Sequence, residues 1–544
     1  MPSQERNGKW KRRHTLMITA GISVSSLLVI LGIWAHSVTR VPEMFRLNKA
    51  CQEEGYYMGE FEFKMMGFVY YLDKGRYAKA VSGIRKLHRQ LQSREGLIKV
   101  PRFDDKKQEM EFYLDLQNPR TGAFMDDAYP WCTYNECTEN VLNHLDALAK
   151  ETGQPLRLKY PLKYLDEINT PDKLKAFLDD VSNVGWIAAK FPQTTFVFAR
   201  SLLSYCNGEG VMEINGLYRF SPEWKQALLQ WFYDNQDSVT GFWGPKARKN
   251  GRLLKTDLTN TASIIKAFVD RDGKDIYASF PLRHKNEMFA TALQVMSEPV
   301  PDDADLDEWH EWALKMGKGS YMLTRYLWKD ASPKNKAEAR KLIENLIRIK
   351  FDKYYIPDEG AFAYYPGSRH ATLDGTGGVM GKFADIGVFS VEKQRQLWGG
   401  PEETCRDFGR ADVAALTERD FNSLKDCKDI NSLRFYSGAP ETGNYTDGVT
   451  CVFYPGTTPV LDIMELVPKV RNWMNTTSQS MGNWTSRETV LGELSDVKIE
   501  PVPVFRGEIP LEQANKILRE NKTLTVIGFD VLQVPRGRMT WSLK

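Results

Sequence analysis

Hydrophobic residues in the middle of the chain recur with the spacing of α-helices. Trp224, Leu228 and Trp231 fall on one side of a helix. Ser221 and Pro222 precede them, as a typical N-cap residue and a first-turn proline. The same apolar spacing follows Ser332-Pro333, at Leu342, Ile343, Leu346 and Ile347. This pattern predicts amphipathic helices that each bury one side against a neighbour.

Three of these helices lead into a shared turn that contains a glycine. Gly122, Gly241 and Gly360 are 119 residues apart both times, and each precedes a loop and a second apolar segment. Helix, glycine turn, loop and helix form an α-hairpin, and each interval leaves room for a second hairpin. The sequence therefore predicts an all-α main body, an α/α toroid of about six helical hairpins around a central cavity.

The second turn carries the most specific resemblance. Its helix ends at Gln236, and a glycine and two aromatic residues follow, the last of them Trp243. This pattern resembles the Gln-Trp type repeat of the terpenoid cyclase and protein prenyltransferase α/α toroid superfamily, over about residues 100–390. Phe124 replaces the tryptophan in the first repeat, and Tyr355 stands at the glutamine offset in the third. The resemblance implies that these residues join neighbouring hairpins, and the cyclases' Asp-x-Asp-Asp acid motif is missing.

The N-terminus predicts a membrane anchor. Residues 1–14 contain five lysine and arginine residues, and residues 15–35 are uncharged and long enough to cross a bilayer as a helix. Positive charge on the leading side retains that side in the cytoplasm. We therefore expect a basic cytoplasmic tail, a transmembrane helix that partners the membrane, and the bulk of the chain on the extracytoplasmic side. A cleaved signal peptide is the alternative.

The remaining chain divides into two predicted domains. Residues 40–400 form the α/α toroid domain. Beyond them the helical repeat fades, and short alternating apolar segments such as 524–527 and 530–534 are typical of β-strands. Residues 430–544 are therefore predicted to be a small C-terminal α+β appendage.

Composition excludes several kinds of partner and site. The net charge is only +3 and no long basic stripe is present, so we expect no nucleic acid partner. Cys132 and Cys137 form a close pair without a matching second pair, which argues against structural zinc. Cys405 and Cys427 are either a disulfide or two free thiols. No phosphate-binding loop and no Asp-Asp-x-x-Asp metal motif is present, so no cofactor is expected. The resemblance leaves zinc ligation of the prenyltransferase kind open, but no residue spacing selects it, and no metal is predicted.

The loops that follow the repeat glycines supply the candidate site. In a toroid these loops lead into the inner helices and surround the mouth of the cavity, and Asp257 and Asp374 stand just before inner helices at nearly the same repeat position. The candidate catalytic residues are Asp257, Asp374 and His370, as general acids and bases. The candidate substrate-binding residues are Trp131, Glu136, Trp243, Asn260, Tyr365 and Arg369. The structural alternatives are helix N-caps for the aspartates and core packing for the tryptophans.

These observations predict a membrane-anchored extracytoplasmic α/α-toroid protein that binds or cleaves a glycan in its central cavity. The sequence leaves open whether the chain is an enzyme; glycoside hydrolase and polysaccharide lyase are the candidate classes. The alternatives are a terpenoid cyclase or prenyl-binding enzyme, with a prenyl-type ligand, and a non-catalytic envelope scaffold. Charged groups in the cavity favour a glycan, a purely apolar lining favours prenyl chemistry, and a cavity filled by side chains favours a scaffold.

Overall fold

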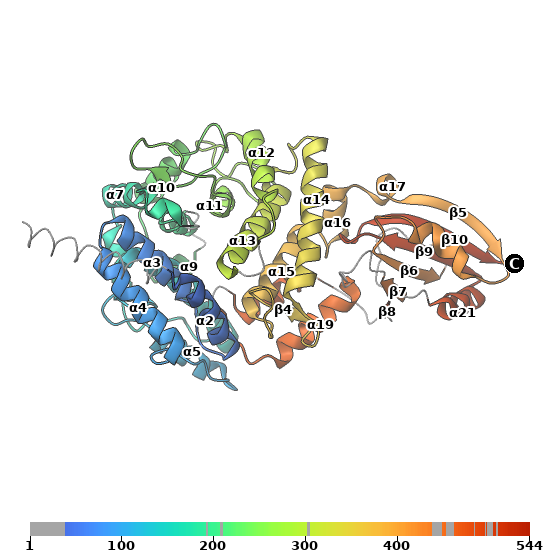
Figure 1. Cartoon of the computed structure of the whole chain (residues 1–544), viewed down its shortest axis with the longest axis horizontal. Helices are drawn as coiled ribbons and strands as arrows, with labels where there is room; N and C mark the ends of the chain where they lie inside the picture. The colour runs from blue at the N-terminus through green and yellow to red at the C-terminus, as the bar shows by residue number, and fades with distance from the viewer. Residues whose placement is uncertain are drawn as a thin grey trace, which may run out of the picture.

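The computed structural model is mostly helical, with a small β-sheet near the C-terminus (Figure 1). It describes residues 39–191, 194–206, 210–301, 305–437, 449–452, 462–482, 485–495, 497, 504–506 and 510–544. The prediction of a helical main body followed by a region with both helices and strands is confirmed at this level.

The main body contains the helices from α2 to α16. Their bounds are α2 (Val41–Glu53), α3 (Phe61–Asp73), α4 (Tyr77–Ser93), α5 (Lys106–Asp115), α6 (Tyr134–Thr152), α7 (Pro171–Ser182), α8 (Val197–Arg200), α9 (Val211–Ile214), α10 (Pro222–Asp234), α11 (Leu258–Ile264), α12 (Lys285–Met296), α13 (Leu306–Met322), α14 (Pro333–Ile349), α15 (Leu373–Asp385) and α16 (Val391–Trp398). The two predicted serine caps are confirmed, since Ser221 Oγ accepts from Trp224 N and Ser332 Oγ accepts from Asn335 N, both at 3.2 Å.

The three glycine turns have the same backbone conformation. The φ angles are 76°, 72° and 69° at Gly122, Gly241 and Gly360. This left-handed region favours glycine because it has no Cβ. In the first two turns a glutamine amide bridges the turn to a distant loop. Gln117 donates to the carbonyls of Gly122 and Tyr160, and Gln236 donates to those of Gly241 and Arg283, at 2.7–2.9 Å.

A threonine on each helix that follows a turn fixes that helix against the turn. The Oγ1 atoms of Thr138, Thr261 and Thr376 accept from the backbone N–H groups of Phe124, Trp243 and Phe362, each at 3.1 Å. These equivalent bonds give α6, α11 and α15 a common structural register. A short hairpin of β3 (Tyr355–Ile356) and β4 (Ala361–Phe362) forms the third turn.

The C-terminal sheet has six strands in the order β5-β10-β9-β6-β7-β8. Its strands are β5 (Arg406–Val413), β6 (Ser432–Ser437), β7 (Val449–Val452), β8 (Val504–Arg506), β9 (Thr523–Phe529) and β10 (Pro535–Leu543). The helices of this region are α17 (Pro401–Thr404), α18 (Asn422–Lys425), α19 (Ile463–Thr476), α20 (Arg487–Glu493) and α21 (Leu511–Asn521). Leu433, Phe435 and Trp541 belong to a core of the sheet that is separate from the main core.

Two helices of the C-terminal region pack into the main body instead. Leu466 and Val470 of α19 and Val490 of α20 belong to the same core as the body helices. α19 lies beside β4 (Figure 1), and α20 packs against α15. A Cβ at Gly377 of α15 would lie 2.7 Å from Thr485 Cγ2, so this glycine allows the close approach. The glycine-rich third repeat therefore receives a segment from the predicted C-terminal appendage.

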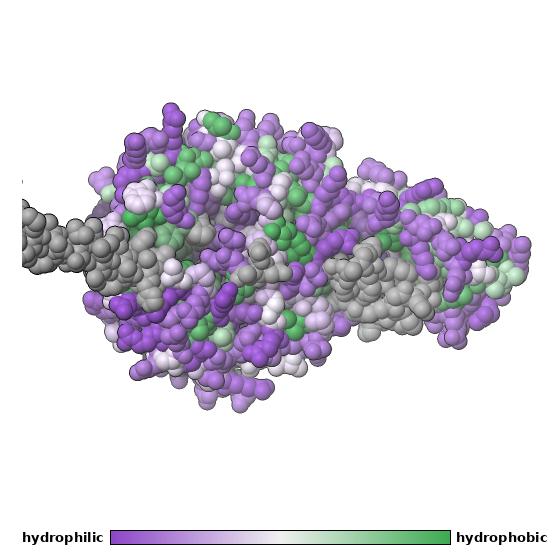
Figure 2. Space-filling view, in the orientation of Figure 1, coloured by the Kyte–Doolittle hydropathy of each residue, from purple (hydrophilic) through white to green (hydrophobic). Residues whose placement is uncertain are grey.

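The apolar sides of the body helices face inward. Trp224, Leu228 and Phe232 of α10 are fully buried. On the face in Figure 2, hydrophilic residues predominate over the helical body, and hydrophobic residues form scattered patches. The helical periodicity of the sequence thus corresponds to burial in the folded protein.

The predicted location of the protein requires correction. The basic tail at 1–14 and the anchor at 15–35 lie outside the described residues. Within the described part of the chain, no helix is sufficiently long and apolar to cross a membrane. This finding contradicts the prediction of a single-pass membrane protein with its bulk on the extracytoplasmic side, and that localisation is not retained.

The structure decides between a disulfide and two free thiols for the second cysteine pair. Cys405 and Cys427 are both free thiols, and both side chains are half-buried. The disulfide alternative is therefore not realised in this structure.

Candidate functional site

The helical body surrounds a cavity of about 590 Å³. Six helices, α3, α6, α8, α11, α13 and α15, each contribute residues to its wall. Further contributions come from α14 and from Thr485 of the C-terminal region. Apolar side chains such as Met66 and Ile347 form part of the wall, and charged side chains form much of the remainder.

Two glutamates of α6 stand three residues apart in this wall. Glu136 forms an ion pair with Arg200 of α8. Glu139 accepts a hydrogen bond from Ser204 Oγ at 2.6 Å. Burial, followed by the charge of Glu136, raises the pKa of Glu139 to about 7. One carboxylate therefore has a guanidinium partner, while its neighbour is about half protonated near neutral pH.

Asp257 combines a structural position with a place in the wall. It is the N-cap of α11, and its Oδ1 accepts from Asn260 N at 3.0 Å. Its second oxygen accepts from Asn260 Nδ2 at 2.7 Å. The N-cap alternative is therefore confirmed for Asp257, and both oxygens are engaged by Asn260.

Asp374 occupies a different position from Asp257. It lies inside the first turn of α15, whose N-cap is Thr372. In the register set by the three threonines, Asp374 and Glu136 both lie two residues before the threonine, whereas Asp257 lies four before it. The residue equivalent to Asp374 is thus Glu136, and Asp257 stands two residues earlier in this register.

A histidine and a glutamate meet on the opposite part of the wall. His310 Nε2 of α13 lies 3.2 Å from Glu62 Oε1 of α3, and Tyr364 Oη donates to the same oxygen at 2.8 Å. Burial opposes ionisation of both partners. Their mutual attraction nevertheless raises the pKa of His310 and lowers that of Glu62. The pair is therefore an ionised contact within the wall.

Lysines form a third group in the cavity. Lys350 lies 3.6 Å from the centroid of the Tyr354 ring. Burial and the charge of Lys382 lower the pKa of Lys350 to about 7. Burial is also the largest effect that lowers the pKa of Lys382. The cavity thus holds cations whose charged forms are disfavoured by their surroundings.

The structure brings four of the nine predicted site residues to the cavity. They are Glu136, Asp257, Asn260 and Asp374. Trp131 and Trp243 do not line it. Trp131 packs against Phe177 with ring centroids 4.8 Å apart, and Trp243 Nε1 donates to the Phe232 carbonyl at 2.6 Å. Both tryptophans pack between helices, as the core alternative predicts.

The other three predicted residues lie in the loop after β4 but do not line the cavity. His370 is 58% exposed and lies 2.6 Å from Glu359. The Arg369 side chain is also exposed, and Tyr365 is buried with its hydroxyl accepting from Asn48 at 3.1 Å. After Tyr364 the loop packs on α2, where Lys49 Nζ donates to the Gly367 carbonyl at 2.9 Å.

Several wall residues had no signal in the sequence analysis. Glu62, His310 and Lys382 lie outside the loops that follow the repeat glycines. Glu139 is the exception, because a helical spacing of three from Glu136 places both on one side of α6. That spacing was the one available signal.

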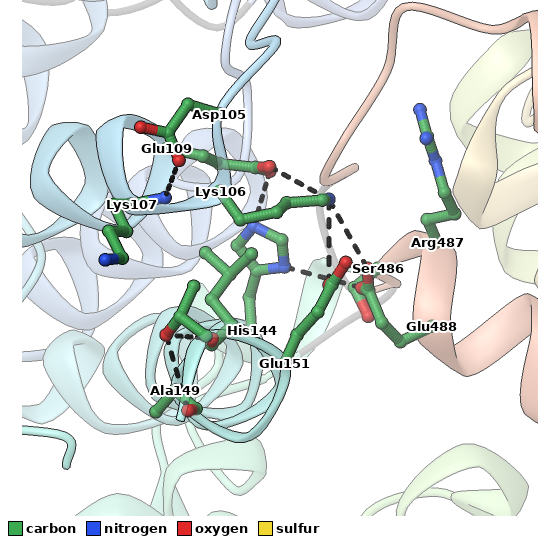
Figure 3. Close-up of polar contacts among 12 residues, drawn as sticks. Asp105, Lys106, Lys107, Glu109, His144, Ala149, Glu151, Ser486, Arg487 and Glu488 are labelled. Carbon is green, nitrogen blue, oxygen red and sulfur yellow. Dashed lines mark hydrogen bonds and ion pairs between the residues drawn. The ribbon is translucent and has the colours of Figure 1, made fainter. Parts of the chain in front are cut away.

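A second charged cluster lies away from the cavity (Figure 3). His144 Nε2 of α6 lies 3.0 Å from Glu109 Oε1 of α5, and His144 Nδ1 lies 3.7 Å from Glu488 Oε2 of α20. Lys106 Nζ lies 3.1 Å from Glu109 Oε2. Each of these groups has an opposite charge beside it, and the cluster joins the C-terminal region to the body.

Comparison with protein-family models, with curated proteins and with solved structures finds no match. Among the residues that the structure describes, no group of three or more His, Cys, Asp and Glu side chains is arranged to hold a metal ion.

Proposed function

We propose that the helical body is an α/α toroid that binds a glycan in its central cavity and hydrolyses a glycosidic bond there. The observation that carries this proposal is the pair of glutamates on α6. Glycoside hydrolysis needs one protonated and one ionised carboxyl group at the scissile bond. Glu139 has a pKa of about 7, and Glu136 is ion-paired with Arg200.

Each carboxyl group has a specific role in this mechanism. Glu139 donates its proton to the glycosidic oxygen as the bond to the anomeric carbon breaks. Glu136 or Asp374, which share a structural register, stabilises the positive charge that develops on the sugar or activates a water. The charged wall also offers donors and acceptors for sugar hydroxyls, whereas a prenyl chain requires an apolar lining.

Lyase chemistry has less support from the cavity. A lyase of this kind needs a base that removes a proton from the sugar ring. Tyr364 is the nearest candidate, but burial and the charge of Glu62 raise its pKa well above the usual value. A tyrosine that donates its proton to a carboxylate is a poor base near neutral pH.

The test is a turnover screen of the full chain against aryl glycosides and a panel of polysaccharides, with Glu139→Gln, Glu136→Gln and Asp374→Asn. We expect Glu139→Gln to reduce kcat by about 10²–10⁴-fold without lowering Tm. Wild-type activity should fall as pH rises through about 7, because Glu139 then loses its proton.

His370→Ala is the matched control, since His370 is an exposed residue outside the cavity. We expect it to retain wild-type activity. Full activity in Glu139→Gln would contradict the assigned acid. An unsaturated product absorbing in the ultraviolet would identify a lyase, and the absence of turnover on every substrate would contradict the hydrolase.

A further inference from the structure

A second pocket of about 330 Å³ adjoins the central cavity. It lies between α11, α13 and α15, toward their C-terminal ends. Ser263, Lys318, Gly378 and Lys382 line both spaces. A ligand in the central cavity is therefore in direct reach of the second pocket.

The side chains of this pocket, here called the basic pocket, are mostly cationic. Its six cations are Lys266, Arg271, Lys318, Arg325, Lys382 and Lys393, and its two carboxylates are Asp385 and Glu493. Asp385 is shared, since it lies 3.2 Å from Arg325 and 3.8 Å from Lys382. Within the described ranges of the chain, Lys266 and Lys318 have no carboxylate at ion-pair distance. The basic pocket thus contains a large excess of positive charge.

This excess is unfavourable in the absence of a ligand. Burial lowers the pKa of Lys318 well below its usual value, and the charges of Lys382, Lys266 and Arg200 add to the shift. Like charges enclosed together cost free energy unless an anion lies among them.

The backbone of α13 is irregular where it reaches the basic pocket. A π-helical turn at 323–327 follows α13 and carries Arg325. Such turns are frequent at functional sites. Arg325 and Lys382 both lie over the ring of Tyr321, at 5.4 and 5.0 Å from its centroid. The tyrosine ring therefore holds two of the cations side by side.

We propose that the basic pocket binds a phosphate or sulfate group carried by the ligand of the central cavity. Lysine and arginine side chains that converge from three helices match the several oxygens of such a group. The shared wall allows one ligand to place its sugar part in the cavity and its anionic group in the pocket. The location of the sugar part rests on the proposed function, whereas binding of the anion does not.

Titration of the full chain with inorganic phosphate and with inorganic sulfate, followed by calorimetry at low ionic strength, tests the anion site. We expect Lys318→Met and Lys266→Gln each to weaken binding by about tenfold, because each removes one charged donor. Lys341→Met is the matched control. Lys341 is an exposed lysine of α14 outside both pockets, so this variant should bind as the wild type does.

Stability provides a second readout that a purely structural role would not produce. Without an anion, Lys318→Met should raise Tm, because it removes an enclosed charge that has no partner. Phosphate should raise Tm in the wild type and much less in this variant. Lys266 is exposed, so Lys266→Gln tests the same site without disturbing the core. Phosphate and sulfate that bind no more tightly than chloride, or variants that bind them unchanged, would overturn the proposal.

The origin of the anionic group is tested with glucose 6-phosphate and with glucose. A sugar phosphate that binds more tightly than inorganic phosphate supports a ligand that spans both spaces. Equal binding would overturn the extension into the central cavity. Failure of the hydrolase proposal is distinguishable, because it would leave phosphate binding intact while every glycan remains uncleaved.

Discussion

Arg434 and Lys318 are both cationic side chains enclosed by the fold, but their surroundings differ. Arg434 Nη2 lies 3.0 Å from Asp462 Oδ2 and 2.6 Å from Gln533 Oε1, where the sheet meets the start of α19. Lys318 lies between two cavities with other cations around it. Opposite charges at a seam stabilise the packing of two segments, whereas unbalanced charge beside a cavity indicates a place for a ligand.

The same contrast holds for the carboxylates. Glu109 and Glu488 flank His144 between α5, α6 and α20, and their pKa values are lowered despite burial. Glu139 lies in the cavity wall, and its pKa is raised. Substitutions at the seams should therefore reduce stability, and substitutions in the cavities should reduce binding while leaving stability equal or higher.

The largest expected effect is at the seam of the sheet. Asp462→Ala leaves Arg434 buried without its carboxylate and removes the cap that accepts from Met464 N at 2.8 Å. We expect the free energy of unfolding to fall by about 3–5 kcal/mol, measured by urea denaturation followed through tryptophan fluorescence. The double variant Arg434→Met/Asp462→Ala should recover part of that loss. If the losses of the two single variants add up in the double variant, the unpaired charge of Arg434 is not the cause of the instability of Asp462→Ala.

The next effect concerns the seam of Figure 3. Glu488→Gln should lower the free energy of unfolding by about 1–3 kcal/mol, because the carboxylate that pairs with the buried His144 at 3.7 Å is lost. Burial opposes ionisation of Glu488, but His144 lowers its pKa to about 2. The stabilisation by Glu488 is therefore present above about pH 4.5 and is lost as pH falls toward 2.

The pKa of His144 is shifted in the other direction. Burial disfavours its charge, but Glu109 and Glu488 raise its pKa. Its contribution is present below about pH 6.5 and is lost as pH rises through the raised value. The cost of Glu488→Gln should therefore be greatest between about pH 4.5 and 6.5. Thermal denaturation at a series of pH values checks this. A loss of stability that does not vary with pH would contradict the assigned ion pair between His144 and Glu488.

Substitution of a lysine in the cavity should raise the free energy of unfolding instead of lowering it. Lys350→Met is expected to raise the free energy of unfolding by about 1–2 kcal/mol, because methionine fills the space without a charge. The pKa of Lys350 is about 7, below its unfolded value of 10.5, so its charge destabilises the fold fully below pH 7. The gain should decrease as pH rises toward 10.5. A destabilised variant at pH 6, in urea denaturation, would exclude this account.

The smallest effect is expected at the surface. Lys175 Nζ lies 2.6 Å from Asp179 Oδ2 on the exposed side of α7. Lys175→Ala should change the free energy of unfolding by less than about 0.5 kcal/mol, because water and salt screen such pairs. Urea denaturation in low and high salt is the measurement. A larger loss would contradict this account, because it would show that an exposed ion pair stabilises the fold as much as an enclosed one.

The sequence was sufficient for the parts of the fold that local signals determine. Serine-proline pairs begin helices because the cap and the fixed proline φ act within one turn of the chain. The repeat glycines mark turns because only their backbone conformation is needed there. These signals pointed to the three loops that follow the glycines. The predicted acid of each loop lines the cavity, namely Glu136, Asp257 and Asp374.

The register of those acids was beyond sequence reasoning. The bond from Thr138 returns to Phe124 across 14 residues, but the bond from Thr261 returns to Trp243 across 18. The second loop is therefore longer, and its acid stands at the N-cap of the helix, whereas Glu136 and Asp374 lie inside the first turn of theirs. The length of a loop in the sequence does not show at which residue the following helix begins.

Several charged residues of the cavity wall had no recognisable sequence signal. Glu62, His310 and Lys318 lie on α3 and α13, which follow no repeat glycine. Single charged residues on an amphipathic helix are usually solvated, so their sequence pattern is that of an ordinary surface. Only the closure of the body turns them toward one another.

The contact between α20 and α15 has a consequence for synthesis of the protein. About a hundred residues separate the end of α15 from α20. At about 5–20 residues per second, a ribosome needs about 5–20 s to make them. Throughout that interval the nascent body has an incomplete wall and an uncovered glycine-rich flank at Gly377. Co-translational folding can therefore finish the body only after most of the chain has emerged, and chaperones have that interval in which to bind the open flank.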